Sequence, residues 1–391
     1  MKKLKIAFFG GTFANLEIYN KCKLLGAECY LLDKNKNCFA KNEKNFRNID
    51  FNNKKKVIEF IIKNNINFLY TTQSDVGIKS LGYLNSRFDL PGTSHKLAQI
   101  LTDKYKIRKI LHRKGFQQPK FFLITSKSKN FNYFKDGFLI KPVDSSGSRG
   151  IFEITKNSDI NQLIKKTLTF SKSKKLILEE KIEGSEFGAQ TFSINGRCKN
   201  VILHDDFMSS YNEKIPIGHA MPFSLIKNSN EKFKIKKIIK RAVDALGVEN
   251  GPCNVDCIYS KAKKLYILEV SPRVGATCLP NMLKIYTGID WDINTIKLLN
   301  FIKIKKIEEK KINVFAKVFE SNKSGIVKKI RIKRHSKKDE IKFLVKNNQK
   351  IEKFTNGSKL FGYIVAFSKN RNYLIKNINK TIRSIKIKFK K

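Results

Sequence analysis

Acidic residues are scarce in this 391-residue sequence: 33 Asp and Glu stand against 80 Lys and Arg, which gives a formal net charge of +47. A basic chain can bind nucleic acid, anionic lipid or acidic metabolites. A dedicated nucleic-acid surface is typically a localised stripe rich in Arg, whereas Lys is spread along this whole chain together with Asn, Ile and Phe. These four residues share AT-rich codons. Genome composition therefore explains the charge better, and a basic nucleic-acid-binding protein stays an alternative.

The sequence also lacks a long apolar run and paired cysteine motifs. No run approaches the roughly 20 apolar residues that a membrane helix requires. The basic start "MKKLKIAFFGGTFA" imitates a signal peptide, but its apolar part breaks at Gly10 and Gly11, which a first strand and a glycine turn explain better. Seven cysteines without a C-x-x-C pair argue against a disulfide framework or a zinc site. We expect a soluble, cytoplasmic protein.

Residues 1–98 lack the G-x-G-x-x-G spacing of a dinucleotide-binding turn, which leaves an NAD-dependent oxidoreductase as the weakest alternative. They contain strand, helix and strand patterns over residues 4–33, followed by further alternation. This predicts a parallel α/β layer that binds ligands at the carboxyl ends of its strands.

After this layer, the pattern over residues 99–302 changes to helices and antiparallel strands, which predicts an α+β region. Residues 303–391 have short strands and a Lys-rich helix, and predict a third, small β-rich domain.

The stretch "NVDCIYSKAKKLYILEVSPR", residues 254–273, predicts an antiparallel hairpin. With the turn at "KAKK", Asp256 lies opposite Glu269 on one face, and Cys257 lies opposite Leu268 on the other, apolar face. Side chains that oppose each other across two strands are roughly 5 Å apart, where two like charges destabilise the sheet. A divalent cation between them resolves the conflict, and two carboxylates suit Mg²⁺ or Mn²⁺. The alternative is a shifted register, or two acids that both face solvent.

Two further stretches are candidates for nucleotide binding, but each of them is a weak signal when it is taken alone. In "FLIKPVDSSGSRGI", Lys141 ends an apolar strand and a Ser/Gly loop follows, whose backbone N–H groups suit phosphate oxygens. In "LILEEKIEGSE", a strand ends in acids and Glu186 follows a glycine turn, where it suits a ribose hydroxyl. Each of these stretches also fits an ordinary turn or surface charge.

Taken in order, these stretches resemble the ATP-grasp superfamily, in particular its carbamoyl-phosphate-synthetase-like and carboxylate-amine ligase branch. The resemblance covers about the first 300 residues, and it implies a parallel pre-ATP-grasp α/β domain over 1–98 and a two-lobed ATP-grasp domain over 99–302. The residues that carry it are Lys104 in "TDKYKIRKIL", Lys141, the "EEKIEGSE" hinge, Asp256, Glu269 and Arg273.

The resemblance also implies a role for each candidate site residue. The ATP phosphates would be bound by Lys104, Lys141 and the loop residues Ser146, Gly147 and Ser148. The adenine would be held by Glu179, Glu180 and Ile182, and the ribose by Glu186. The catalytic residues would be Arg273, Arg149 and Lys141, and the metal ligands Asp256, Glu269 and Ser271. One departure stands out, because the family's usual Asn at the third metal position is Ser271 here. A hydroxyl is still an oxygen ligand, but a nucleotide-binding protein without turnover becomes an alternative.

The implied reaction is phosphoryl transfer from ATP to a carboxylate, with Mg²⁺ or Mn²⁺ as cofactor, followed by attack of an amine on the acyl phosphate and release of ADP and phosphate. The expected partners are thus a small carboxylate and a small amine, and neither nucleic acid nor a membrane. His204, Asp206 and His219 lie between the hinge and the hairpin, where a His is either structural or contacts the acceptor as a base. In "TTQSDVG", Ser74 or Asp75 either caps a helix or binds the acid substrate.

Overall fold

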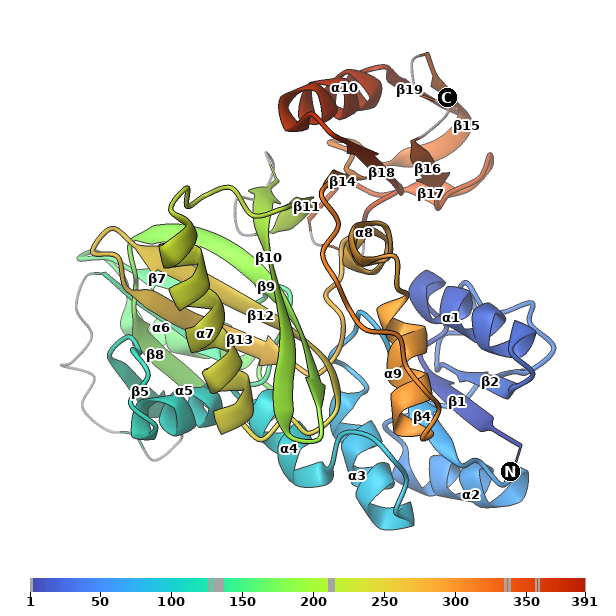
Figure 1. Cartoon of the computed structure of the whole chain (residues 1–391), viewed down its shortest axis with the longest axis horizontal. Coiled ribbons are helices and arrows are strands. Elements are labelled where there is room, and N and C mark those ends of the chain that lie inside the picture. The colour runs from blue at the N-terminus through green and yellow to red at the C-terminus, as the bar shows by residue number, and fades with distance from the viewer. Residues whose placement is uncertain are drawn as a thin grey trace.

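In this computed structural model, the described residues are 3–125, 128, 137–209, 215–333, 336, 339–355, 357 and 359–390. Figure 1 shows the first part of the chain, in blue, beside a larger region coloured from cyan to yellow, with the last part in red above them. No helix within these residues is long and apolar enough to cross a membrane. The combination of a parallel layer with antiparallel sheets confirms the predicted fold class.

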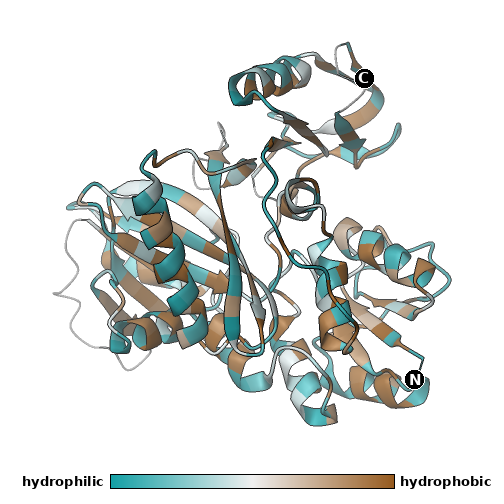
Figure 2. Cartoon of the chain, viewed as in Figure 1, coloured by the Kyte–Doolittle hydropathy of each residue, from teal (hydrophilic) through white to brown (hydrophobic). Residues whose placement is uncertain are grey.

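The first part of the chain is a parallel four-stranded sheet with the order β3-β2-β1-β4. Its apolar strands pack against helices because the side chains of β1 alternate between two buried faces. Figure 2 shows β1 coloured as hydrophobic along most of its length. The elements of this layer are β1 (Lys5–Phe9), α1 (Phe13–Leu24), β2 (Glu28–Leu32), β3 (Phe46–Arg47), α2 (Lys54–Asn64), β4 (Phe68–Tyr70) and α3 (Ile78–Phe88).

A small antiparallel sheet with the order β5-β8-β6-β7 forms the next lobe. It is preceded by two helices and covered by α6, whose side chains pack on Ile140 and Leu178. The elements are α4 (His95–Leu101), α5 (Lys104–Arg113), β5 (Phe121–Ile124), β6 (Phe138–Pro142), β7 (Phe152–Ile154), α6 (Ile160–Leu168) and β8 (Leu176–Glu180).

The large sheet has eight strands with the order β13-β12-β9-β10-β11-β14-β18-β16. Helix α7 covers one face of its first strands, and Figure 2 shows this helix alternating between hydrophobic and hydrophilic residues. Helix α8 packs on the other face, beyond the polar area described below. The elements are β9 (Gly184–Ile194), β10 (Arg197–Met208), β11 (Pro216–Met221), α7 (Ser229–Ala245), β12 (Gly251–Ser260), β13 (Leu265–Ser271) and α8 (Leu279–Thr287).

The last part of the chain shares this sheet. Three of its strands continue the large sheet, and a further sheet, β17-β15-β19, packs with α10 around Phe319 and Ile378. The predicted boundary at residue 302 stays a prediction, and strands from both sides of it lie in one sheet. The elements are α9 (Trp291–Leu299), β14 (Asn313–Phe319), β15 (Gly325–Ile332), β16 (Glu340–Phe343), β17 (Lys350–Ile351), β18 (Gly362–Ser368), α10 (Arg371–Arg383) and β19 (Ile385–Phe389).

The hairpin β12–β13 forms with one difference from its predicted register. Asp256 pairs with Glu269 as predicted, but a bulge follows, so that Cys257 pairs with Ile267 and not with Leu268. The predicted pairing of Cys257 with Leu268 is therefore wrong. The extra residue allows Ile267 and Val270, three positions apart, to face the same core under α7.

Candidate active site

The opposed carboxylates Asp256 and Glu269 lie on the face of the large sheet that α7 does not cover. Burial, together with the Glu269 carboxylate, raises the pKa of Asp256 to about 7. Asn254, two residues earlier on the same face, donates from Nδ2 to Oδ1 of Asp256 at 2.8 Å. The structure thus confirms that two acids share one small space, which is the arrangement that a divalent cation stabilises.

Lys104 reaches this acid pair from the first residue of α5. Asp103 caps the helix by accepting from the Lys106 N–H at 3.0 Å, and the Lys104 N–H donates to the carbonyl of Val143 at 2.9 Å. The Lys104 Nζ atom lies 3.2 Å from Oε2 of Glu269. The start of α5, the segment after β6 and the hairpin β12–β13 therefore meet at Lys104.

A cluster of buried ionised side chains lies next to Lys104. Its members Lys141 and Glu179 are predicted site residues, whereas Arg108 is not. Glu179 on β8 forms ion pairs with Lys141 on β6 and with Arg108 on α5. Burial alone would raise the pKa of Glu179, but Arg108 and Lys141 hold it at about 2. Arg108 is fully buried and also donates to the carbonyls of Ile267 and Leu268, at 2.9 and 2.7 Å. The sequence contained one signal for Arg108, because it follows Lys104 by one helical turn.

The other residues predicted to bind the nucleoside lie after this cluster. Glu180 ends β8, where its N–H donates to the carbonyl of Lys120 at 2.9 Å, and Ile182 lies half-buried between β8 and β9. Glu186 lies on β9, on the same face as Asp206, and both removal from water and the Asp206 carboxylate raise its pKa. Their roles in binding adenine and ribose stay predictions.

A cavity of about 340 Å³ opens beside the acid pair. It brings together five predicted site residues from three segments, namely Lys104, Ser146, Arg149, Glu269 and Ser271. Gly147 and Arg149 are exposed at the loop, where Arg149 Nε donates to the Ser146 carbonyl at 2.9 Å. Gly147 and Ser148 both have positive φ, 68° and 56°. Successive residues of this kind turn backbone N–H groups towards a common point, which suits an anion.

Arg273 is held by a residue from the first part of the chain. Asp75, between β4 and α3, accepts from Nε and Nη2 of Arg273 at 2.9 and 2.6 Å. Burial opposes ionisation of Asp75, yet Arg273 and the Ser271 hydroxyl hold its pKa below the usual value. The predicted helix cap at Ser74 or Asp75 is wrong, because the N-cap of α3 is Gly77, without a side-chain hydrogen bond. Asp75 also lines the cavity.

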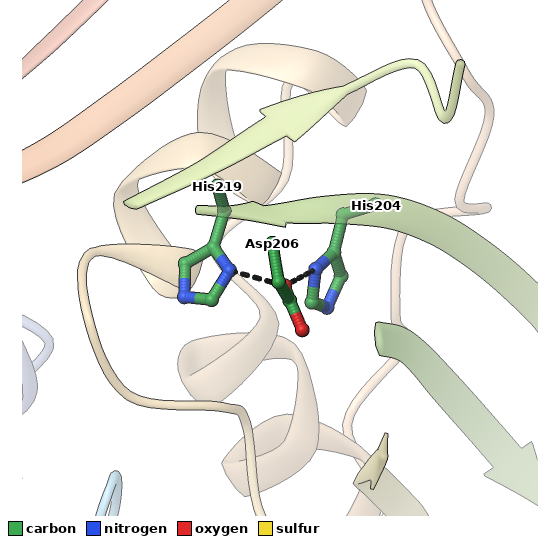
Figure 3. Close-up of side chains that lie close together, drawn as sticks. All are labelled: His204, Asp206 and His219. Atoms are coloured by element: carbon green, nitrogen blue, oxygen red, sulfur yellow. Dashed lines mark hydrogen bonds and ion pairs between the residues drawn. The ribbon is translucent and has the colours of Figure 1, made fainter. Parts of the chain in front are cut away.

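A buried group of two histidines and one acid extends the polar face (Figure 3). His204 and Asp206 are two residues apart on β10, and His219 lies opposite Asp206 on β11. The Nδ1 atoms of His204 and His219 lie 2.8 and 2.6 Å from Oδ1 of Asp206. Burial alone would raise the pKa of Asp206, but the two histidines lower it, whereas burial lowers the pKa of His219.

Comparison with known proteins gives a family match over the middle of the chain. Residues 101–277 match the model of the ATP-grasp domain. The phosphoribosylamine–glycine ligase of Pyrococcus furiosus is 23% identical in an alignment of 271 residues that covers 64% of this chain and 61% of that relative. The D-alanine–D-alanine ligase of Fusobacterium nucleatum is 26% identical over 220 residues, 55% of this chain and 69% of the relative. The chain thus spans less than two thirds of the length of the first of these curated relatives.

Solved structures extend the similarity to the whole chain. Phosphoribosylglycinamide synthetase from Anaerococcus prevotii superposes with a TM-score of 0.79 at 25% identity, over 100% of both chains. An L-amino acid ligase from Bacillus licheniformis has the same fold, with a TM-score of 0.78 at 16% identity over 100% of both chains. The predicted resemblance to ATP-grasp ligases is confirmed by these matches.

Proposed function

We propose that this chain, whose residues 101–277 match the ATP-grasp domain, is an ATP-dependent ligase that joins a carboxylate to an amine. It transfers the terminal phosphate of ATP to the carboxylate, and the amine then attacks the acyl phosphate to form an amide. ADP and phosphate are released. The observation that carries this proposal is the acid pair Asp256–Glu269, which meets Lys104 at the edge of a cavity lined by the Ser/Gly loop.

The donor set fits Mg²⁺ or Mn²⁺. Two partly buried carboxylates oppose each other, and both removal from water and the charge of Glu269 raise the pKa of Asp256. A cation between the two acids would remove their repulsion. Asp256 and Glu269 would hold the ion, with the Ser271 hydroxyl nearby. When bound, the ion neutralises phosphate charge in the transition state. The Ser271 hydroxyl also forms a hydrogen bond with Asp75. It would therefore be a metal ligand only where it turns from Asp75 towards the ion.

The remaining residues position the phosphates and exclude water. Lys104 and Arg149, both at the cavity, would neutralise the triphosphate, while the loop N–H groups would donate hydrogen bonds to its oxygens. Lys141 is buried beside Glu179, and from there it would supply a fixed positive field, not a mobile contact. Arg273, fixed in orientation by Asp75, would stabilise charge that develops on the transferred group.

The names of the relatives suggest which acid to test first. One similar ligase is named for glycine, one for D-alanine and one for L-amino acids. An amino acid is therefore the first carboxylate to test with this chain, and ammonia, amino acids and amino sugars are the first amines.

Glu269→Gln tests this proposal directly. We expect the wild type to release phosphate from ATP in a manner that depends on Mg²⁺ and on an added acid. Glu269→Gln removes one charge of the acid pair and should reduce this rate at least about 100-fold, because charge neutralisation by the ion is lost. Glu59→Gln, an exposed acid on α2, is the matched control and should keep the full rate. Unchanged turnover in Glu269→Gln would show that the acid pair has another role.

A non-catalytic ATP-binding protein is the second candidate, because Ser271 stands where the family usually has Asn. Calorimetric titration with ATP and Mg²⁺, compared with phosphate release over the acid and amine panel, separates the two. Tight binding without turnover for every combination favours the second candidate.

A further inference from the structure

The group His204–Asp206–His219 is not used by the mechanism above, and its hydrogen bonds define what it can do. One ring nitrogen from each histidine and one carboxylate oxygen lie within 4.8 Å of one another, which is close enough for a metal ion. The three side chains lie on the face of the sheet that carries Asp256, with both histidines buried and Asp206 partly buried. The choice between a metal site and a proton path depends on which ring nitrogens carry hydrogen.

A chain of hydrogen bonds fixes the tautomer of His204. The backbone N–H of Gly275 can only donate, and it donates to Oε1 of Gln190 at 2.9 Å. The Gln190 amide nitrogen therefore points the other way, towards Oδ1 of Asn254 at 2.5 Å and Nε2 of His204 at 3.2 Å. Because an amide nitrogen only donates, Nε2 of His204 accepts, and its hydrogen is on Nδ1.

This tautomer disfavours a metal ion between the three residues. A metal on Nδ1 of His204 would move the hydrogen to Nε2, where it would face the NH₂ group of Gln190. With hydrogen on Nδ1, His204 instead donates to Oδ1 of Asp206. The same oxygen accepts from Nδ1 of His219. Among the residues that the structure describes, none hydrogen-bonds to Nε2 of His219.

Nε2 of His219 is thus an unprotonated ring nitrogen to which no described residue donates, and the ring is held in place by the partly buried carboxylate of Asp206. Such a nitrogen accepts a proton, and the charge that results lies against Asp206. His219 lies three strands from Asp256 in the sheet order, about 14 Å at 4.8 Å per strand. The amine nucleophile attacks a carbonyl that lies beyond the transferred phosphate, so a base for the amine belongs away from the metal pair.

We propose that Nε2 of His219 takes the proton from the amine substrate, with Asp206 as its positioning residue and His204 fixing Asp206. This rests on the proposed ligase function. In the step, the amine nitrogen forms its bond to the acyl carbon while the bond from that carbon to the phosphate oxygen breaks. Phosphate leaves with the electron pair, and the proton of the amine passes to Nε2. The imidazolium is neutralised by Asp206.

Hydroxylamine separates acyl-phosphate formation from base catalysis, because it is uncharged at neutral pH and attacks without a base. Whichever amino acid supports phosphate release in the wild type is incubated with ATP, Mg²⁺ and either hydroxylamine or ammonium. In His219→Gln and Asp206→Asn we expect hydroxamate formation within about 2-fold of the wild type, and amide formation reduced about 100-fold. His112→Gln, an exposed histidine on α5, is the matched control and should change neither.

The outcomes are distinct. Equal loss of hydroxamate and amide in both variants would show a structural role, and retention of both would show no role; either result overturns this inference alone. A wild type that forms no hydroxamate with any acid overturns the ligase proposal and this inference with it. Nitrogen-15 NMR of histidine-labelled protein gives a check without turnover: hydrogen is expected on Nδ1 of both residues at pH 7.5, and hydrogen on Nε2 of His219 would contradict the inference.

Discussion

At the scale of single residues, Gly188 makes room for the group of histidines. It lies inside β9 opposite His204, and a Cβ atom there would be 2.1 Å from Cε1 of the His204 ring. The imidazole thus lies across the backbone of β9. A glycine within a strand pattern is a sequence signal for such a close approach.

Gly188→Ala should therefore displace the His204 ring and break its contacts with Gln190 and Asp206. We expect a loss of unfolding free energy of about 1–3 kcal/mol, as for other overpacked sites. Amide formation should fall more than hydroxamate formation. Chemical denaturation and the two trapping assays measure this. Gly357→Ala, where an added Cβ meets nothing within 4 Å and φ is not positive, serves as a comparison for the loss of glycine itself.

Asp292 on α9 is a buried carboxyl group that should make the stability of the protein depend on pH. Burial and the neighbouring Asp290 raise its pKa to about 6, while Tyr70 donates to its Oδ1 atom at 2.7 Å. Because the folded state holds this proton more tightly than the unfolded chain does, stability falls as pH rises from about 4 to about 6 and stays lower above it. The penalty is about 3 kcal/mol at pH 7.

Asp292→Asn removes this ionisation. Its unfolding free energy, measured in urea from pH 4 to pH 8, should fall less than that of the wild type over this interval. A wild type and variant with parallel pH profiles would show that Asp292 does not titrate there.

At the scale of elements, the hairpin shows what a period of two can predict. The opposition of Asp256 and Glu269 follows from alternation and a turn, and the structure confirms it. The bulge at Leu268 was not predicted. At that point Arg108, from elsewhere in the chain, donates hydrogen bonds to the carbonyls of Ile267 and Leu268. A long-range contact of this kind leaves no local pattern in the sequence of the hairpin.

The cap of α5 decides where Lys104 lies. Asp103→Ala removes the hydrogen bond to the Lys106 N–H and should cost about 1 kcal/mol of unfolding free energy. Because Lys104 is the next residue, ATP affinity should also fall. Asn370→Ala removes the equivalent cap of α10, at 2.9 Å from the Tyr373 N–H. It should lower stability by a similar amount without changing ATP affinity, and an equal change in affinity for both variants would contradict this assignment.

At the scale of the whole molecule, segments far apart in the sequence complete one another. Asp75 from the first layer holds Arg273, and α9 packs back on that layer through Ile296. The sequence predicted the separate parts, because each has its own periodicity. It did not predict these connections, because the partner residues of Arg273 and α9 are about 200 positions away.

The site residues were predicted from their order in the chain and their residue types, and their roles stay predictions. Lys104, Ser146, Arg149, Glu269 and Ser271 meet at one cavity, as members of one site should. Gln190 was not predicted, because a polar residue inside an apolar strand has no distinguishing spacing of its own. Arg108 was not predicted either, although it follows Lys104 by one helical turn.

The central claim is that this cavity transfers phosphate from ATP to a carboxylate. Oxygen-18 in the carboxylate of the accepted acid tests it most directly, with mass spectrometry of the phosphate released during amide formation. The account predicts one oxygen-18 atom in each phosphate, because the acyl phosphate passes its bridging oxygen to phosphate when the amine attacks. Unlabelled phosphate, with turnover intact, would contradict it.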